Sequence, residues 1–260
     1  MLAILFAFLV SLLMLQPLQS RERIQGNVRL GVDWGLKPKS KKHKILTYIT
    51  THLSDGHREF LKHCWPHLLN RLPLFHISDF MMFITKDQFD DDKAFIESVF
   101  GEKGITTVFV SNPGYNEGAI LALVEGFTKG WFKDYEWVVR VNPDVVIKND
   151  TFILATMADS SISGIFVDCL DRPCPAGRGC ASRHIHTDFF AIRPSAVSLD
   201  AILATNEGNA ELMAMKAFSE IVKNQADVWL PGTGPQGGQC RVTGAASPVV
   251  HDHLVSSCVA

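Results

Sequence analysis

The chain has no excess of charge of either sign. Its 260 residues contain 25 Lys and Arg against 27 Asp and Glu, so the formal net charge is -2. Without a basic excess, the composition gives no support to nucleic-acid binding, and we expect no nucleic-acid partner. The one basic run, residues 37–44, is interpreted as a solvated linker. Because 47% of the residues are hydrophobic, the chain can bury a core sufficient for one large α/β domain or two small ones.

Cysteine spacing typical of a zinc site is also missing. Three cysteines crowd into residues 169–180, but no paired C-x-x-C or Cys/His set accompanies them. Disulfides are therefore the expected use, which implies an oxidising compartment. The sequence leaves the pairing open. The six cysteines are Cys64, Cys169, Cys174, Cys180, Cys240 and Cys258.

Lys and Arg are absent from residues 1–20. We interpret this N-terminal segment as a signal peptide or a signal-anchor. Residues 1–15 are apolar except for Ser11, and a helix of about 18 apolar-leaning residues would span roughly 27 Å. Arg21 and Arg23 follow, a pattern that disfavours a lumenal C-terminus, whereas the even number of cysteines favours one. We expect the secretory pathway, with the chain either anchored in the ER or Golgi membrane as a type II protein or secreted after cleavage. Residues 21–43 form the predicted stem.

From residue 44 onward, strand and helix patterns alternate. Strands are predicted over 44–51, 80–85, 105–110 and 137–141, separated by helices over 54–69 (kinked or split at Pro66), 90–100 and 117–130. This order implies an α/β, Rossmann-like fold with a mixed, mostly parallel central sheet and helices on both faces. Beyond residue 150 we expect a short helix through Met157, strands over 164–168 and 186–194, a helix over 209–223, a Gly/Pro-rich loop over 231–238 and a tail containing residues 251–253.

The strand WVVRV ends in Asn142-Pro143-Asp144. Pro143 interrupts regular pairing, and side chains two positions apart in extended backbone point to the same side. Asn142 and Asp144 could therefore share one Mg²⁺ or Mn²⁺ ion. A simple turn is the alternative. The metal interpretation gains support because the predicted loops with His52 and residues 112–118 should reach the same sheet edge, where ligands bind in such folds.

In its order of elements, the chain resembles GT-A-type glycosyltransferases, which carry an acidic D-x-D-like motif at a strand end. Residues 137–145 (WVVRVNPDV) are similar to the W-x-R-x-E-P-D-V stretch of Golgi α-mannosyltransferases, with Asn142 where that family has Glu. This departure removes a charge, so either the metal affinity should fall or the ligand role rests on Asp144 alone. The resemblance implies a GT-A-like domain over 44–260, with a nucleotide-binding half over 44–150 and an acceptor half over 151–260.

The resemblance also implies a late histidine that completes the metal site, and a strand, here 186–194, that faces the donor sugar. His251 and His253 are the candidates for the histidine, and a solvated tail is the alternative for both. Imidazole is an acceptable ligand for Mn²⁺ and a poor one for Mg²⁺, so we expect Mn²⁺ (or Mg²⁺) together with a nucleotide-sugar donor.

Two further charged side chains are catalytic candidates. Asp188, flanked by Phe189 and Phe190, would be partly desolvated, which raises a carboxyl pKa and suits a base or a nucleophile-like group. A strand-entry turn is its alternative role. Arg140 lies inside an apolar strand and is costly to bury unpaired, so it should meet an internal carboxylate or a diphosphate.

Five residues are candidates for cofactor binding, and one of them is Asn142, at the end of the WVVRV strand. Tyr115, Asn116 and Glu117 adjoin the start of the predicted helix, where they could cap it or contact a phosphate at its N-terminus. His52 ends the first strand, where a nucleotide base could stack.

The function predicted from these residues is a metal-dependent glycosyltransferase with a glycan or glycoprotein acceptor. The alternative is a non-catalytic carbohydrate-binding or interaction protein on the same scaffold, suggested by the missing first acidic residue. A two-metal phosphoesterase would need a denser cluster of ligands.

Overall fold

The computed structural model describes residues 45–87, 90–168, 184–204, 210–230, 233–236, 239–242, 247–251 and 253–258. All of them belong to one compact unit, Ser40–Ala260. The predictions for residues 1–20, 21–43 and 169–180, and for the basic run, lie outside the described residues. Within the described ranges, no helix combines the length and the apolar character needed to cross a membrane. The division into nucleotide-binding and acceptor halves stays a prediction.

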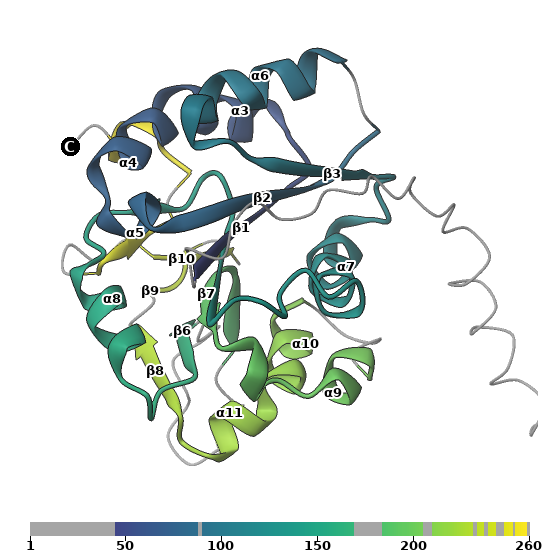
Figure 1. The fold of residues 1–260 in the computed structure, drawn as a ribbon, viewed down its shortest axis with the longest axis vertical. Helices are drawn as coiled ribbons and strands as arrows, with labels where there is room; N and C mark the ends of the chain where they lie inside the picture. Colours follow the sequence, from purple (N-terminus) through teal and green to yellow (C-terminus); the bar gives the residue numbers. More distant parts are fainter. Residues whose placement is uncertain are drawn as a thin grey trace, which may run out of the picture. The chain divides into compact units, whose positions relative to one another are not determined.

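A seven-stranded sheet runs through this unit in the order β3-β2-β1-β4-β7-β6-β8 (Figure 1). Its strands are β1 (Ile45–Thr51), β2 (Ser78–Thr85), β3 (Thr106–Val110), β4 (Trp137–Val141), β6 (Gly164–Asp168), β7 (Ile185–Ile192) and β8 (Asp227–Leu230). Strand β7 is antiparallel to both of its neighbours, β4 and β6, and all the other neighbouring pairs in this sheet are parallel. The predicted α/β class with a mixed, mostly parallel sheet is confirmed. Because β7 is reversed, its first residues lie at the edge where β1 and β4 end.

Helices cover both faces of the sheet, as predicted (Figure 1). One face packs against α3 (Asp55–His63), α4 (Trp65–Arg71), α5 (Pro73–His76), α6 (Asp90–Phe100) and α8 (Thr151–Ala158). The other packs against α7 (Tyr115–Thr128), α9 (Leu199–Leu203), α10 (Ala210–Ala217) and α11 (Ser219–Lys223). Each face has its own aromatic core, with Trp65 stacked on Phe75 in the first and Phe166 stacked on Phe218 in the second.

Local signals set several helix boundaries. Ser54 is the N-cap of α3, and its Oγ accepts a hydrogen bond from the backbone N–H of His57 (3.3 Å). Pro66 lies in the first turn of α4, a position that tolerates proline, and the helix predicted across it is split at Cys64 as expected.

Two predictions for the second half of the chain are wrong. The helix expected over 209–223 is two helices, because α10 ends at Ala217 and α11 begins at Ser219. The Gly/Pro-rich stretch expected to be a loop contains β9 (Thr233–Gln236), which pairs antiparallel with β10 (Gln239–Arg241). Backbone hydrogen bonds make such a hairpin without the apolar alternation by which strands are recognised in a sequence.

The C-terminal segment is held at two points. The short strand β11 (Val249–Val250) pairs antiparallel with β5 (Val146–Ile147), just beyond Asp144. Farther along, a disulfide joins Cys64 to Cys258 at the end of the 3-10 helix η3 (Val255–Cys258), confirming one of the expected disulfides. The solvated-tail alternative is therefore wrong for His251, which is buried.

Removal of the Cys64–Cys258 disulfide should destabilise the fold. The bond joins positions 194 apart, so it restricts the unfolded chain over a long loop. We expect Cys64→Ala combined with Cys258→Ala to lower the free energy of unfolding by about 2–5 kcal/mol. Urea unfolding followed by circular dichroism measures the change, with Ser98→Ala on the exposed side of α6 as the control. An unfolding midpoint equal to that of the control would contradict this expectation.

Candidate functional site

The Asn-Pro-Asp triplet forms a turn at the sheet edge where β1 and β4 end and β7 begins. The backbone N–H of Asn142 still donates to the carbonyl oxygen of Asp188 (2.9 Å), and the N–H of Val145 then closes back onto the carbonyl of Asn142 (3.1 Å). From α4, the buried indole N–H of Trp65 donates to the carbonyl of Pro143 (2.9 Å). The triplet is therefore both a turn and the device that holds Asp144 at this edge.

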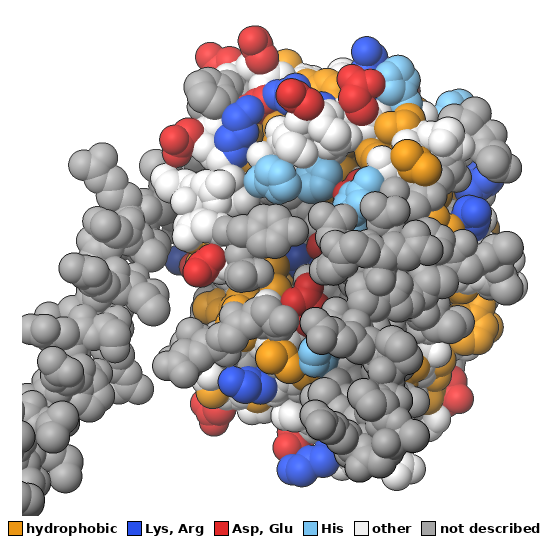
Figure 2. Space-filling view, turned by 180° about the vertical axis from the view of Figure 1, so that it is seen from behind, with side chains coloured by type: hydrophobic (Ala, Val, Ile, Leu, Met, Phe, Trp, Pro, Cys, Tyr) orange, Lys and Arg blue, Asp and Glu red, His pale blue; other side chains and the backbone are white. Residues whose placement is uncertain are grey.

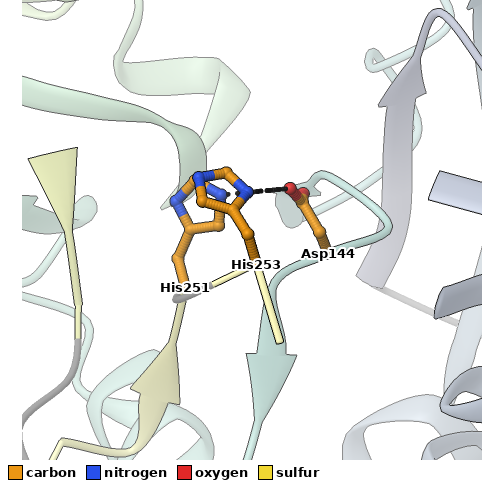
Figure 3. A group of neighbouring side chains, drawn as sticks. All are labelled: Asp144, His251 and His253. Carbon is orange, nitrogen blue, oxygen red and sulfur yellow. Dashed lines mark hydrogen bonds and ion pairs between the residues drawn. The ribbon is translucent and has the colours of Figure 1, made fainter. Parts of the chain in front are cut away.

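Asp144 is a buried carboxylate surrounded by imidazoles. Its Oδ2 lies 2.9 Å from Nδ1 of His253 and 3.2 Å from Nε2 of His251, both of which reach it from the segment after β11 (Figure 3). Its Oδ1 lies 3.5 Å from Nε2 of His57, at the start of α3. Burial alone would raise the pKa of Asp144, but its hydrogen bonds with His251 and His253 and its contact with His57 outweigh burial and hold this pKa well below its usual range. The group is thus an ionised carboxylate.

These ligand atoms suit a divalent cation. Asp144, His251 and His253 each offer one atom, all within 4.8 Å of one another. Asp144 Oδ1 is buried and has no hydrogen-bond partner among the described residues, because its contact with His57 is an ion-pair distance only. A carboxylate with imidazoles favours Mn²⁺ over Mg²⁺.

Histidine and acidic side chains lie next to one another on the surface shown in Figure 2. A second group of ligand type is formed by His186, Asp188 and His251. His251 belongs to both groups, so the two clusters form one continuous array.

Asn142 is placed beside Asp188 by the structure. Its Nδ2 donates to Asp188 Oδ1 (2.6 Å), and its Oδ1 accepts from the hydroxyl of Thr50 (2.7 Å). Thr50 in turn accepts from Nε of Arg140 (3.1 Å). The network crosses β1, β4 and β7 and orients the Asp188 carboxylate, whose side chain is 29% exposed. A metal-ligand role for Asn142 stays a prediction.

Arg140 is buried beneath this network and lies over the ring of Phe190, 5.5 Å from its centroid. Burial lowers the pKa of Arg140, while the charge of Asp188 acts in the opposite direction. In the part of the chain that the structure describes, no hydrogen bond reaches the Nη1 atom. Asp188 is thus an internal carboxylate whose charge acts on Arg140.

The predicted donor-binding residues are less closely grouped than the residues around Asp144. His52 is exposed at the end of β1, with its ring centroid 4.8 Å from that of His57. Partial loss of solvent around the ring and the neighbouring His57 lower the pKa of His52, which favours a neutral ring suited to stacking. Glu117 is exposed in the first turn of α7, and no contact between described residues joins it to Asp144. The side chains of Tyr115 and Asn116 lie outside the described residues.

Sequence reasoning missed three residues of the site: Thr50, His57 and His186. His57 stands at the third position of α3, three residues after its cap, directly beyond the end of β1. The signal that could have identified His57 is that a capped helix follows the first strand closely, which places the first turn of this helix at the same edge of the sheet. His186 and Asp188 are two positions apart on β7, so strand alternation could have placed them on one face.

No protein-family model and no curated protein matches the chain. It is similar to a proposed nucleotide-diphospho-sugar transferase from Desulfovibrio desulfuricans G20, with 11% identity and a TM-score of 0.49 over 75% of this chain and 82% of that one. It is also similar to the mannosyltransferase PcManGT from Pyrobaculum calidifontis, solved with GDP-Man and Mn2+, with 12% identity and a TM-score of 0.46 over 78% of this chain and 58% of that one. A third similar structure is mouse xyloside xylosyltransferase 1, with 6% identity and a TM-score of 0.44 over 72% of this chain and 85% of that one.

Loss of the Thr50 hydroxyl should weaken the network that orients Asp188. Thr50→Val leaves Arg140 Nε and Asn142 Oδ1 without this partner, so we expect the free energy of unfolding to fall by about 1–3 kcal/mol. Thr47→Val is the matched control on the same strand, because no described residue hydrogen-bonds the buried Thr47 hydroxyl. Denaturant unfolding of both variants decides the point. Equal losses for the two variants would show that the network contributes nothing.

Proposed function

We propose that the chain is a metal-dependent glycosyltransferase that moves a sugar from a nucleotide-diphosphate donor to a glycan or glycoprotein acceptor. The observation that carries this proposal is the buried, ionised Asp144, placed at the ligand-binding edge of the sheet and surrounded by the imidazoles of His57, His251 and His253. A lone buried carboxylate is costly, and a carboxylate with imidazole nitrogens beside it is a combination that binds divalent cations.

The chemistry needs positive charge near the departing diphosphate. When bound, a divalent cation supplies that charge as a Lewis acid. Asp144 would hold the ion, and the imidazole of His57 lies beside its buried Oδ1. Arg140 would add a fixed donor, because its Nη1 lacks a hydrogen-bond partner among the described residues and a diphosphate or sugar oxygen can accept from it.

Asp188 is the proposed reactive carboxylate. Its Oδ1 accepts from Asn142 at 2.6 Å, so the side chain is fixed in orientation while remaining partly exposed. A positioned and accessible carboxylate can remove a proton from an acceptor hydroxyl or act on the donor sugar directly. Arg140 lies close enough for the charge of Asp188 to act on its guanidinium group, so the two side chains belong to one electrostatic network.

The secretory pathway is the proposed location. The Cys64–Cys258 disulfide requires an oxidising compartment, and the apolar residues 1–15 provide a secretory signal. If the N-terminal segment is not cleaved, it would attach the protein to the ER or Golgi membrane.

One observation favours a second candidate, a non-catalytic carbohydrate-binding protein on the same scaffold. Asn142 stands at the first position of the D-x-D-like motif, and its amide is engaged by Thr50 and Asp188. A protein that only binds sugars would keep these hydrogen bonds and show no turnover.

A nucleotide-sugar donor should stabilise the protein only when Mn²⁺ is present. At a donor concentration about 100-fold above Kd, binding adds about 2.7 kcal/mol and should raise the melting temperature by roughly 5–10 °C. We expect a thermal-shift screen of UDP- and GDP-sugars with full-length protein to identify the donor. Asp144→Asn should abolish the Mn²⁺-dependent shift, and Asp91→Asn, on the exposed side of α6, should leave it unchanged. An identical shift with EDTA would refute metal dependence.

Asp188→Asn should separate catalysis from binding. The variant keeps an oxygen that can accept from Asn142 but cannot take a proton, so we expect kcat to fall by about 10²–10⁴-fold. The Mn²⁺-dependent thermal shift should persist, because Asp188 is not needed to hold the donor. Wild-type protein that binds donor and glycan without any turnover would instead favour the carbohydrate-binding alternative.

A further inference from the structure

Four groups lie in a line at the edge of the sheet: the backbone of Asp188, then His186, His251 and Asp144. The N–H of Asp188 donates to His186 Nδ1 (3.0 Å), and His186 Nε2 lies 3.0 Å from His251 Nδ1. His251 Nε2 then lies 3.2 Å from Asp144 Oδ2. Both rings are almost fully buried, so solvent does not compete strongly for these contacts.

The first link fixes the positions of the protons in the rest of the line. A backbone N–H can only donate, so His186 Nδ1 must be the acceptor and carries no proton. The single proton of the neutral ring is therefore on Nε2, which donates to His251 Nδ1. By the same reasoning, His251 carries its proton on Nε2 and donates it to Asp144.

The carboxylate of Asp188 does not alter this assignment. Its Oδ2 lies 3.8 Å from His186 Nδ1 and 3.7 Å from His251 Nδ1. Both separations exceed hydrogen-bond length, whereas the N–H of Asp188 meets His186 at 3.0 Å. The backbone contact therefore decides the tautomer.

We propose that His186 is a positioning residue that fixes the tautomer of His251, so that His251 holds Asp144 as a hydrogen-bond donor and is not a metal ligand. This inference rests on the proposed function in assuming that a cation binds at Asp144. The cation is then assigned to the other edge of the carboxylate, where Oδ1 lies 3.5 Å from His57 Nε2. The expectation that His251 completes the metal site is thereby replaced by a supporting role.

The opposite arrangement is unfavourable for a simple reason. A metal bound to His251 Nε2 would require the proton of that ring to be on Nδ1, and His186 Nε2 would have to accept it. His186 would then carry its own proton on Nδ1, directly against the N–H of Asp188 at 3.0 Å. Two donors would face each other in a buried site.

Nuclear magnetic resonance of the full-length chain labelled with ¹⁵N-histidine tests the tautomers directly. Long-range ¹H–¹⁵N correlations show which ring nitrogen carries the proton, and single His substitutions assign the signals. We expect His186 and His251 both to be neutral and protonated at Nε2, with or without Zn²⁺ as a diamagnetic probe. A His251 ring protonated at Nδ1, or one that loses its Nε2 proton when Zn²⁺ binds, would overturn the proposal.

Two variants of His186 provide a matched pair. His186→Gln keeps a donor toward His251, so the Nε2 tautomer of His251 should remain. His186→Glu offers only acceptor atoms when ionised, so the proton of His251 should move to Nδ1. If His251 keeps the same tautomer in folded His186→Glu, His186 does not control it. Failure of Zn²⁺ to bind at Asp144 would count against the proposed function alone, because the spectrum of metal-free protein still decides the tautomer.

Discussion

A carboxylate taken out of water must recover the solvation that it loses, and this constraint organises the edge of the sheet around Asp144. Burial opposes its ionisation, yet contacts with ring nitrogens of His251, His253 and His57 keep the charged form favoured. The compensation is uneven, because Oδ2 is hydrogen-bonded by two rings while the buried Oδ1 has no hydrogen-bond partner among the described residues. Because of this asymmetry, Oδ2 is held by hydrogen bonds, whereas Oδ1 is the oxygen that we propose binds a cation.

Each member of the site comes from a different part of the chain and is held by its own device. Asp144 follows a buried strand and a turn fixed by the indole of Trp65. His57 belongs to a helix whose start is set by the Ser54 cap. His251, 107 positions after Asp144, is brought back by the pairing of β11 with β5 and by the disulfide beyond it. The site therefore depends on the whole unit being folded, which suits a cluster that no single segment could hold.

The sequence was informative where local patterns determine structure. Apolar strands, the Ser54 cap and the break near Pro66 identified the sheet and its first helices, and the position of Asp144 after β4 followed from them. It could not show that the tail returns, because β5 and β11 have two residues each, too few for any periodicity. Nor could it foresee that Asn142 would face Asp188, or that His186 would contact His251, since both contacts depend on tertiary placement. The hairpin of β9 and β10 was missed for a related reason, because backbone pairing left no apolar pattern.

The central claim is that Asp144 holds a divalent cation at the edge of the sheet. Anomalous diffraction from crystals grown with Mn²⁺ and a nucleotide diphosphate tests it most directly. The account predicts one strong peak about 2.1 Å from a carboxylate oxygen of Asp144, with the diphosphate bound to the same ion. A map with no peak there, and with the histidines still closed around an ion-free carboxylate, would contradict it.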